Sequence, residues 1–124
     1  MIVCAVSTIA ASEGVGEFDI TPLTDPDNQA ECCINLKGER GTVDLILFSL
    51  GGEYTVTIYG GDGPTATGDY TFTVPNGKGK CFPIPVGETV HKDGYIYFKV
   101  EGDAPLDDLL PLAIALRHCN TVTH

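Results

Sequence analysis

The most reactive side chains in this sequence belong to three histidines and five cysteines. They are His91, His118 and His124, and Cys4, Cys32, Cys33, Cys81 and Cys119. A hydrolytic nucleophile needs a Ser or Cys with a base within hydrogen-bond reach. His118 with Cys33 or Cys81 is the candidate pair, yet no signature surrounds either cysteine. We therefore expect no catalytic residues and interpret His118 as a strand histidine with ordinary partners.

The acidic side chains offer two other kinds of chemistry, glycoside hydrolysis and metal binding. Among 17 Asp and Glu residues, some pair lies at a glycosidase separation by chance. Calcium prefers clustered oxygen ligands, which occur at Asp25, Asp27 and Asn28, and again at Asp62 and Asp69. Neither run has the EF-hand spacing, and no glycine-rich loop leads into a Lys and a helix. The sequence predicts no metal site and no cofactor.

The cysteine count is odd and lacks metal-site spacing. Adjacent residues of a strand point to opposite faces, so Cys32 and Cys33 cannot place both sulfurs on one side. Two interpretations remain open. The thiols are reduced and buried as small apolar groups, or a disulfide joins distant strands after release from a reducing cytoplasm.

Length and composition limit the class of protein. A chain of 124 residues is one domain that buries roughly two thirds of its unfolded surface. A formal charge of −10 repels nucleic acid and anionic membrane, so we expect neither as a partner. With 15 Gly, 8 Pro and many β-branched residues, the chain favours short strands and tight turns.

The stretch from 42 to 60, TVDLILFSLGGEYTVTIYG, organises the predicted fold. It reads as two strands in a hairpin with a turn at Gly51-Gly52. The first strand is apolar on both faces, because Val43, Leu45 and Leu47 alternate with Ile46, Phe48 and Leu50. Such a strand must be covered on both faces, by its own chain or by a partner.

Further strands are predicted on both sides of this stretch. Residues 70–74 alternate and lead into a second hairpin turn at Asn76-Gly77, and prolines confine residues 81–86 to a sheet edge. Residues 95–100 point Ile96, Phe98 and Val100 toward the core, one helical turn falls near 106–110, and a last strand covers 112–119. The pattern predicts an all-β fold, an antiparallel β-sandwich or jelly roll with seven or eight short strands.

The first ten residues are apolar and lack a preceding Lys or Arg, which argues against a secretory signal. They are also too few to span a bilayer. We expect them to form a strand or an arm that lies on a neighbour. The predicted organisation is an N-terminal arm and acidic loop segment over 1–30 and one β-sandwich domain over 31–124.

Apolar residues occur in this arm, on both faces of the strand within 42–50, and in the last predicted strand, where alanines line one face. They indicate a module that binds other protein. The candidate partner-binding residues are Ile2, Val3, Val6, Ile9, Ile46, Phe48, Leu50, Ala113 and Ala115. The alternative is that these side chains only close the core of one sandwich.

The order of segments carries a family resemblance. VDLILFSL is followed by EYTVTIYGGDG, a loop closing on Gly68-Asp69, YTFTVPNGKG, a proline-marked edge, DGYIYFKVEG and PLAIALRH. This run, from 42 to 116, resembles the small β-sandwich proteins that tailed bacteriophages encode among their head genes, decoration or cement proteins in particular. A similar order of strand and turn segments occurs in phage tail and neck proteins and in some carbohydrate-binding modules.

The resemblance implies a non-enzymatic virion protein, made in the host cytoplasm, that binds the outer surface of the capsid and stabilises it. Its partners would be the major capsid protein and copies of itself, with a homotrimer favoured. Two alternatives of other classes remain. In a carbohydrate- or receptor-binding module, Tyr59, Tyr95 and Tyr97 would stack on sugar rings; a small hydrolase would use the Cys–His or carboxylate pairs.

Overall fold

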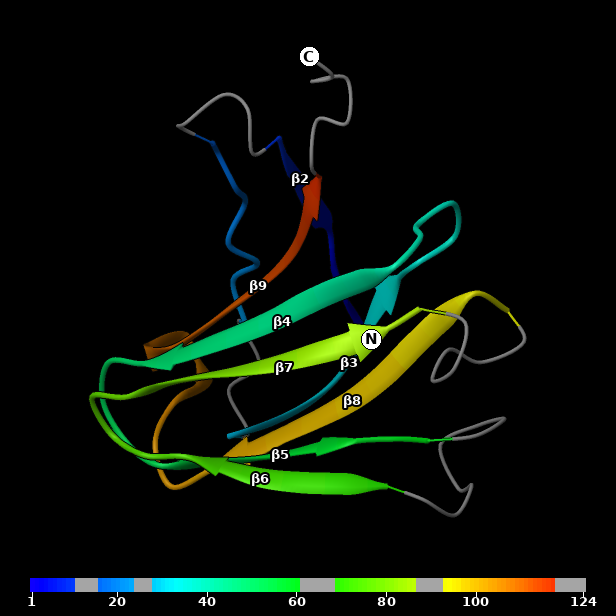
Figure 1. Ribbon diagram of the computed structural model, residues 1–124. Helices are drawn as coiled ribbons and strands as arrows, with labels where there is room; N and C mark the ends of the chain where they lie inside the picture. Colours follow the sequence, from blue (N-terminus) through cyan, green and yellow to red (C-terminus); the bar gives the residue numbers. More distant parts are fainter. Residues whose placement is uncertain (11–15, 24–27, 61–68, 87–92, 118–124) are drawn as a thin grey trace.

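The computed structural model describes residues 1–10, 16–23, 28–60, 69–86 and 93–117, which fold into two packed β-sheets (Figure 1). Sheet A has the strand order β1 (Ile2–Cys4), β3 (Gln29–Asn35), β8 (Tyr95–Gly102), β5 (Tyr54–Ile58) and β6 (Tyr70–Val74). Sheet B has the order β2 (Val6–Ala10), β9 (Leu109–Arg117), β4 (Thr42–Ser49) and β7 (Gly79–Pro85). A short 3-10 helix, η2 (Leu106–Asp108), precedes β9.

The predicted all-β sandwich is confirmed, with nine strands in the described residues. The helical turn predicted near 106–110 is confirmed by η2. Both sheets are mixed, because β1 pairs with β3 and β2 pairs with β9 in parallel, while the other ladders are antiparallel. Purely antiparallel pairing was therefore wrong for the two N-terminal strands.

The core lies between the sheets and takes alternate residues of each strand. From β4 it takes Val43, Leu45 and Leu47, all fully buried. From β8 it takes Ile96, Phe98 and Val100, so the predicted inward face of that strand is confirmed.

The hairpin predicted between residues 42 and 60 is wrong. β4 pairs with β9 and β7 in sheet B, whereas β5 pairs with β6 and β8 in sheet A. The turn at Gly51-Gly52 carries the chain from one sheet to the other, and Gly52 has a φ of 111°. A hairpin would have set the second apolar face of β4 beside the threonines of β5. In β9 that face meets leucines instead, since Ile46 is opposite Leu112.

The turn at Asn76-Gly77 also connects the two sheets, because β6 lies in sheet A and β7 in sheet B. The second predicted hairpin is therefore wrong as well. Turn residues report that the chain reverses, but hydrogen bonding of the flanking strands depends on which neighbours match their faces. The edge position predicted for the proline-bearing strand is confirmed, since β7 is the last strand of sheet B.

The first ten residues form strands of both sheets. β1 pairs with β3 at one edge of sheet A, and β2 pairs with β9 at one edge of sheet B (Figure 1). The chain passes from one sheet to the other at Ala5. Of the two expectations for this segment, the structure contains the strand. Both strands pair with strands of the predicted sandwich segment, β1 with β3 and β2 with β9.

Residues 16–23 run alongside these N-terminal strands. The Asp19 N–H donates to the Ser7 Oγ at 2.9 Å, and the Thr21 N–H donates to the Pro111 carbonyl at 3.2 Å. Leu23 is buried in the core. The segment therefore adds a further layer over β2 and the start of β9.

Tyr54 stabilises the connection between β4 and β5 through hydrogen bonds of its hydroxyl. Its buried hydroxyl donates to the Pro105 carbonyl at 2.5 Å and lies 3.2 Å from the Gly51 carbonyl oxygen. Gly102 gives the ring its space, since a Cβ there would lie 2.3 Å from Tyr54 Cδ1 and 2.8 Å from the Glu53 carbonyl oxygen. The β4–β5 and β8–η2 connections, at one end of the sandwich, thus meet around one side chain.

We predict that Gly102→Ala lowers the free energy of unfolding by about 1–3 kcal/mol, because the methyl group overlaps both the Tyr54 ring and backbone. Urea unfolding followed by far-UV circular dichroism measures the change. Gly51→Ala is the matched control, because its Cβ would meet only the mobile carboxylate of Asp108, 3.0 Å away. Equal stability of the two variants would contradict the prediction.

We predict that Tyr54→Phe costs about 1–2 kcal/mol, because it leaves the Pro105 carbonyl without its donor at a partly buried site. Thermal unfolding checks this. Tyr70→Phe serves as the control, since Tyr70 is 55% exposed and its loss of a hydroxyl is expected to be neutral. A Tyr54→Phe protein as stable as the parent would show that the hydrogen bond from Tyr54 to the Pro105 carbonyl does not contribute to stability.

Candidate functional site

Apolar side chains cover much of the outer face of sheet B, the face turned away from the core. In the β4–β9 register Ile46 is opposite Leu112, and Phe48 is opposite Leu110. Leu112 is buried and Ile46 and Leu110 are half-buried, while Phe48 is 42% exposed. We call these four residues, with Ile114, the apolar face of sheet B.

Two contacts hold the exposed end of this face in place. A Cβ on Gly79 would lie 2.8 Å from Phe48 Cδ1, so the Phe48 ring lies over that glycine of β7. The backbone N–H of Leu50 donates to the Asp108 carbonyl at 2.8 Å, while its side chain is 69% exposed. Both side chains are thus presented to solvent from a fixed backbone.

The other predicted partner-binding residues lie in different places. Val3 is 55% exposed on the edge strand β1, and Ile9 is half-buried on β2. Ile2 and Val6 pack against the core and are partly buried. Ala113 and Ala115 are 0% and 2% exposed inside the sandwich, so the element that packs on the alanines is the chain's own core.

The sequence analysis missed two exposed apolar residues, Phe18 and Ile20, which are 48% and 45% exposed. They lie on the segment that borders β2, and this segment is extended without forming a strand. Their apolar type within an acidic stretch was the available signal.

Two of the four edge strands are poorly suited to adding a further strand. β7 carries Pro83 and Pro85, which lack an N–H, and exposed Lys80. β6 has only five residues. Association through a sheet face is therefore favoured over association through the β6 or β7 edge.

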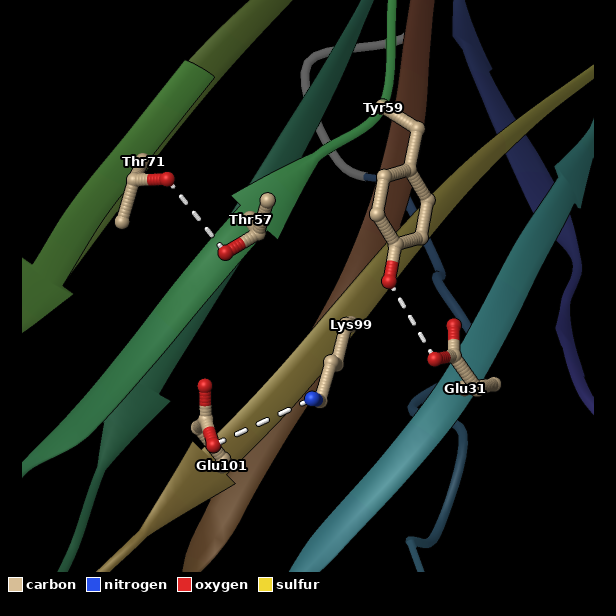
Figure 2. A network of polar contacts seen from close by, with 6 residues as sticks. All are labelled: Glu31, Thr57, Tyr59, Thr71, Lys99 and Glu101. Atoms are coloured by element: carbon tan, nitrogen blue, oxygen red, sulfur yellow. Dashed lines mark hydrogen bonds and ion pairs between the residues drawn. The ribbon is translucent and has the colours of Figure 1, made fainter. Parts of the chain in front are cut away.

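The outer face of sheet A is polar and aromatic. Tyr95, Tyr97 and Lys99 of β8 point outward and are half-buried, as their alternation predicts. The Tyr59 N–H donates to the Tyr97 carbonyl at 2.9 Å, which places Tyr59 beside β8. The Tyr59 hydroxyl then donates to Glu31 Oε1 of β3 at 3.2 Å (Figure 2). All three tyrosines singled out in the sequence therefore share this face.

Carboxylates accept hydrogen bonds from two of these hydroxyls. The Tyr97 hydroxyl donates to Asp93, and this hydrogen bond raises the pKa of Tyr97 to about 12, because ionisation would set two anions together. Burial, and secondly the nearby Glu31 carboxylate, raises the pKa of Tyr59. Both phenols are neutral donors at physiological pH.

A shallow polar hollow of about 360 Å³ lies at the other end of the same face. Its lining includes Glu53, Thr55, Glu101 and Asp103. Lys99 Nζ lies 4.0 Å from Glu101 Oε2, between the hollow and the tyrosines (Figure 2). Asp103 fixes the rim, since its carboxylate accepts the Glu53 N–H at 3.0 Å.

The four described cysteines are free thiols, and three of them fit the first interpretation of reduced and buried thiols. Cys4, Cys32 and Cys33 are buried and Cys81 is exposed. Cys32 faces the core while Cys33 lies opposite Tyr97, so the predicted opposite orientation is confirmed. Burial raises the pKa of Cys4 to about 11, and burial also raises the pKa of Cys32. Such thiols are poor nucleophiles.

Several candidates from the sequence lie outside the described residues. They are the three histidines, Cys119, Asp25, Asp27 and Asp62. Among the residues that the structure describes, no group of three or more His, Cys, Asp or Glu side chains could hold a metal ion. No helix in this part of the chain is long and apolar enough to cross a membrane.

No family model matches this chain, and no curated protein or solved structure matches it.

We predict that stability falls as the pH rises from 9 toward 11. The unfolded chain ionises Cys4 near its ordinary pKa of 9.0, whereas the folded chain holds the proton until about pH 11. Unfolding therefore releases a proton in this window, which favours the unfolded state by up to about 1.4 kcal/mol per pH unit.

Urea unfolding at pH 8, 9.5 and 10.5 measures this slope. Cys4→Ala is less stable at every pH because it leaves a cavity, but its slope is expected to be shallower than that of the parent. Parallel slopes for the two proteins would contradict the assignment.

Proposed function

We propose that this protein is a non-enzymatic structural component of a bacteriophage virion, a decoration or cement protein that binds the outer surface of the head and stabilises it. The observation that carries the proposal is the exposed end of the apolar face of sheet B. There Phe48 and the adjacent Leu50 are exposed to solvent on a fixed backbone. The sequence resemblance over 42–116 supplies the class of partner, the major capsid protein, with copies of the chain itself as the second.

The energetics fit attachment in many copies. Fully burying one large apolar side chain contributes roughly 1.5–3 kcal/mol. Phe48 and Leu50 together would therefore give each subunit a contact of several kcal/mol, against which the ordering cost of association must be set. Contacts of modest strength accumulate when many subunits bind one shell.

Charge would keep free subunits apart before they attach. The formal charge of −10 gives a long-range repulsion between copies, which opposes aggregation through the exposed leucine and phenylalanine. The prolines of β7 oppose edge-to-edge pairing as well. A self-contact such as the expected trimer would then form on the shell, where the partner positions neighbouring copies.

We predict that Leu50→Lys abolishes saturable binding to capsids, because a lysine cannot be buried in an apolar contact without a partner charge. The measurement is titration of the protein onto expanded capsids assembled from the major capsid protein of the same phage. Bound copies are counted after sedimentation, and the parent protein is expected to saturate at a fixed copy number per capsid.

Thr71→Lys is the matched control, since it adds the same charge to the exposed outer face of sheet A, and it is expected to bind like the parent. Absence of parent binding, or equal loss in both variants, would overturn the proposal. Turnover of a small molecule by a monomeric parent would refute the non-enzymatic part.

A further inference from the structure

We infer that the outer face of sheet A is a second binding surface, and that it takes an uncharged oligosaccharide across Tyr59, Tyr95 and Tyr97. Tyr95 and Tyr97 belong to β8, Tyr59 directly follows the neighbouring strand β5, and the three rings project on the same side. This inference does not depend on the capsid proposal, because it uses the opposite face of the sandwich.

The rings are held in place before any ligand arrives. The rings of Tyr95 and Tyr97 lie 6.2 Å apart between centroids, with 26° between their planes. Tyr97 is tied to Asp93 and Tyr59 to Glu31 by their hydroxyl hydrogen bonds. A surface that is already ordered loses little side-chain entropy on binding.

The surroundings of the rings match the two kinds of surface on a sugar. The apolar C–H face of a pyranose packs on an aromatic ring, and its hydroxyl edge needs charged or polar partners. Glu31, Lys99 and Glu101 provide acceptors and a donor next to Tyr59, and Thr57 adds a hydroxyl (Figure 2). Aromatic and hydrogen-bonding groups therefore lie next to one another on one surface.

The shape of the face favours a chain of sugars over a single ring. From Tyr95 to Glu101, β8 extends for about 20 Å. The tyrosines lie at one end and the polar hollow beside Glu101 and Asp103 lies at the other. An extended ligand could contact both, whereas the hollow by itself is too open to enclose a small molecule.

The net negative charge of this face determines which classes of saccharide it can bind. The carboxylates of Glu31, Asp93 and Glu101 outnumber the cations of Lys37 and Lys99 on and beside this face. Lys37 Nζ lies over the Tyr95 ring, 5.2 Å from its centroid, in a cation–π contact that leaves Tyr59 and Tyr97 as the stacking rings. This surplus repels sulfated or carboxylated polysaccharides. Neutral saccharides escape that repulsion.

The test uses the full chain and a panel of uncharged hexasaccharides built from glucose, mannose or N-acetylglucosamine, with a sulfated hexasaccharide as the anionic comparison. The chain has no Trp and three of its five tyrosines lie on this face, so tyrosine emission is the optical signal, and calorimetry gives the affinity. We expect at least one neutral hexasaccharide to bind with a change in tyrosine emission. Tyr97→Ala and Tyr59→Ala should each weaken that binding at least tenfold.

Three further variants keep the test decisive. Tyr70→Ala removes an exposed tyrosine of the β6 edge and should bind like the parent. Tyr97→Phe keeps the ring and should stay within about threefold, which separates loss of stacking from loss of fold. Leu50→Lys should leave sugar binding unchanged, so failure of the capsid proposal and failure of this one are distinguishable.

Binding of no neutral hexasaccharide at millimolar concentration would overturn the inference. Equal affinity in Tyr97→Ala, Tyr59→Ala and the parent would do so as well, and so would tighter binding of the sulfated ligand.

Discussion

The structure depends on the packing of β4, a strand that is apolar on both faces. Its inner residues, Val43, Leu45 and Leu47, meet the core residues of sheet A, so they fix the distance and alignment of the two layers. Its outer residues require apolar neighbours within sheet B, and β9 provides them. Placing β4 beside β9 removes it from β5, and this choice sets the connection between the two sheets.

The connections between the sheets bring backbone N–H and carbonyl groups that lie outside the strand ladders together at one end of the sandwich. The chain crosses between sheets at Gly51-Gly52 and again at Asn76-Gly77, and the loop after β8 arrives at the same end (Figure 1). Carbonyl groups in such crossings need donors. Tyr54 supplies one from inside the core, and Ser49 supplies another, since its Oγ donates to the Gly52 carbonyl at 2.5 Å. The glycine at position 102 exists in this environment because no side chain fits beside the Tyr54 ring.

The two outer faces of the sandwich differ in chemistry, and this difference organises the functional proposals. The outer side of sheet B is aliphatic and ends at Phe48 and Leu50, which suits a dry contact with another protein. The outer side of sheet A carries tyrosines joined to carboxylates, which suits a wet contact rich in hydrogen bonds. Because the faces point in opposite directions, one can attach the molecule while the other remains open to the medium. Of the buried thiols, Cys4 and Cys32 belong to the core, whereas Cys33 lies beside Tyr97 on the outer side of sheet A.

The sequence by itself determined the all-β class, the inward face of β8, and the edge position of β7. These follow from alternation and from proline, which act within a few residues. It also identified Phe48 and Leu50 as residues needing cover, because a strand apolar on both sides cannot satisfy both within one layer. Only the tertiary structure decided that both predicted hairpins are crossings between sheets, and that Ala113 is core. Turn residues constrain the local backbone, whereas the choice of strand neighbours depends on matching faces across the whole chain, and that match exists only after the sheets have assembled.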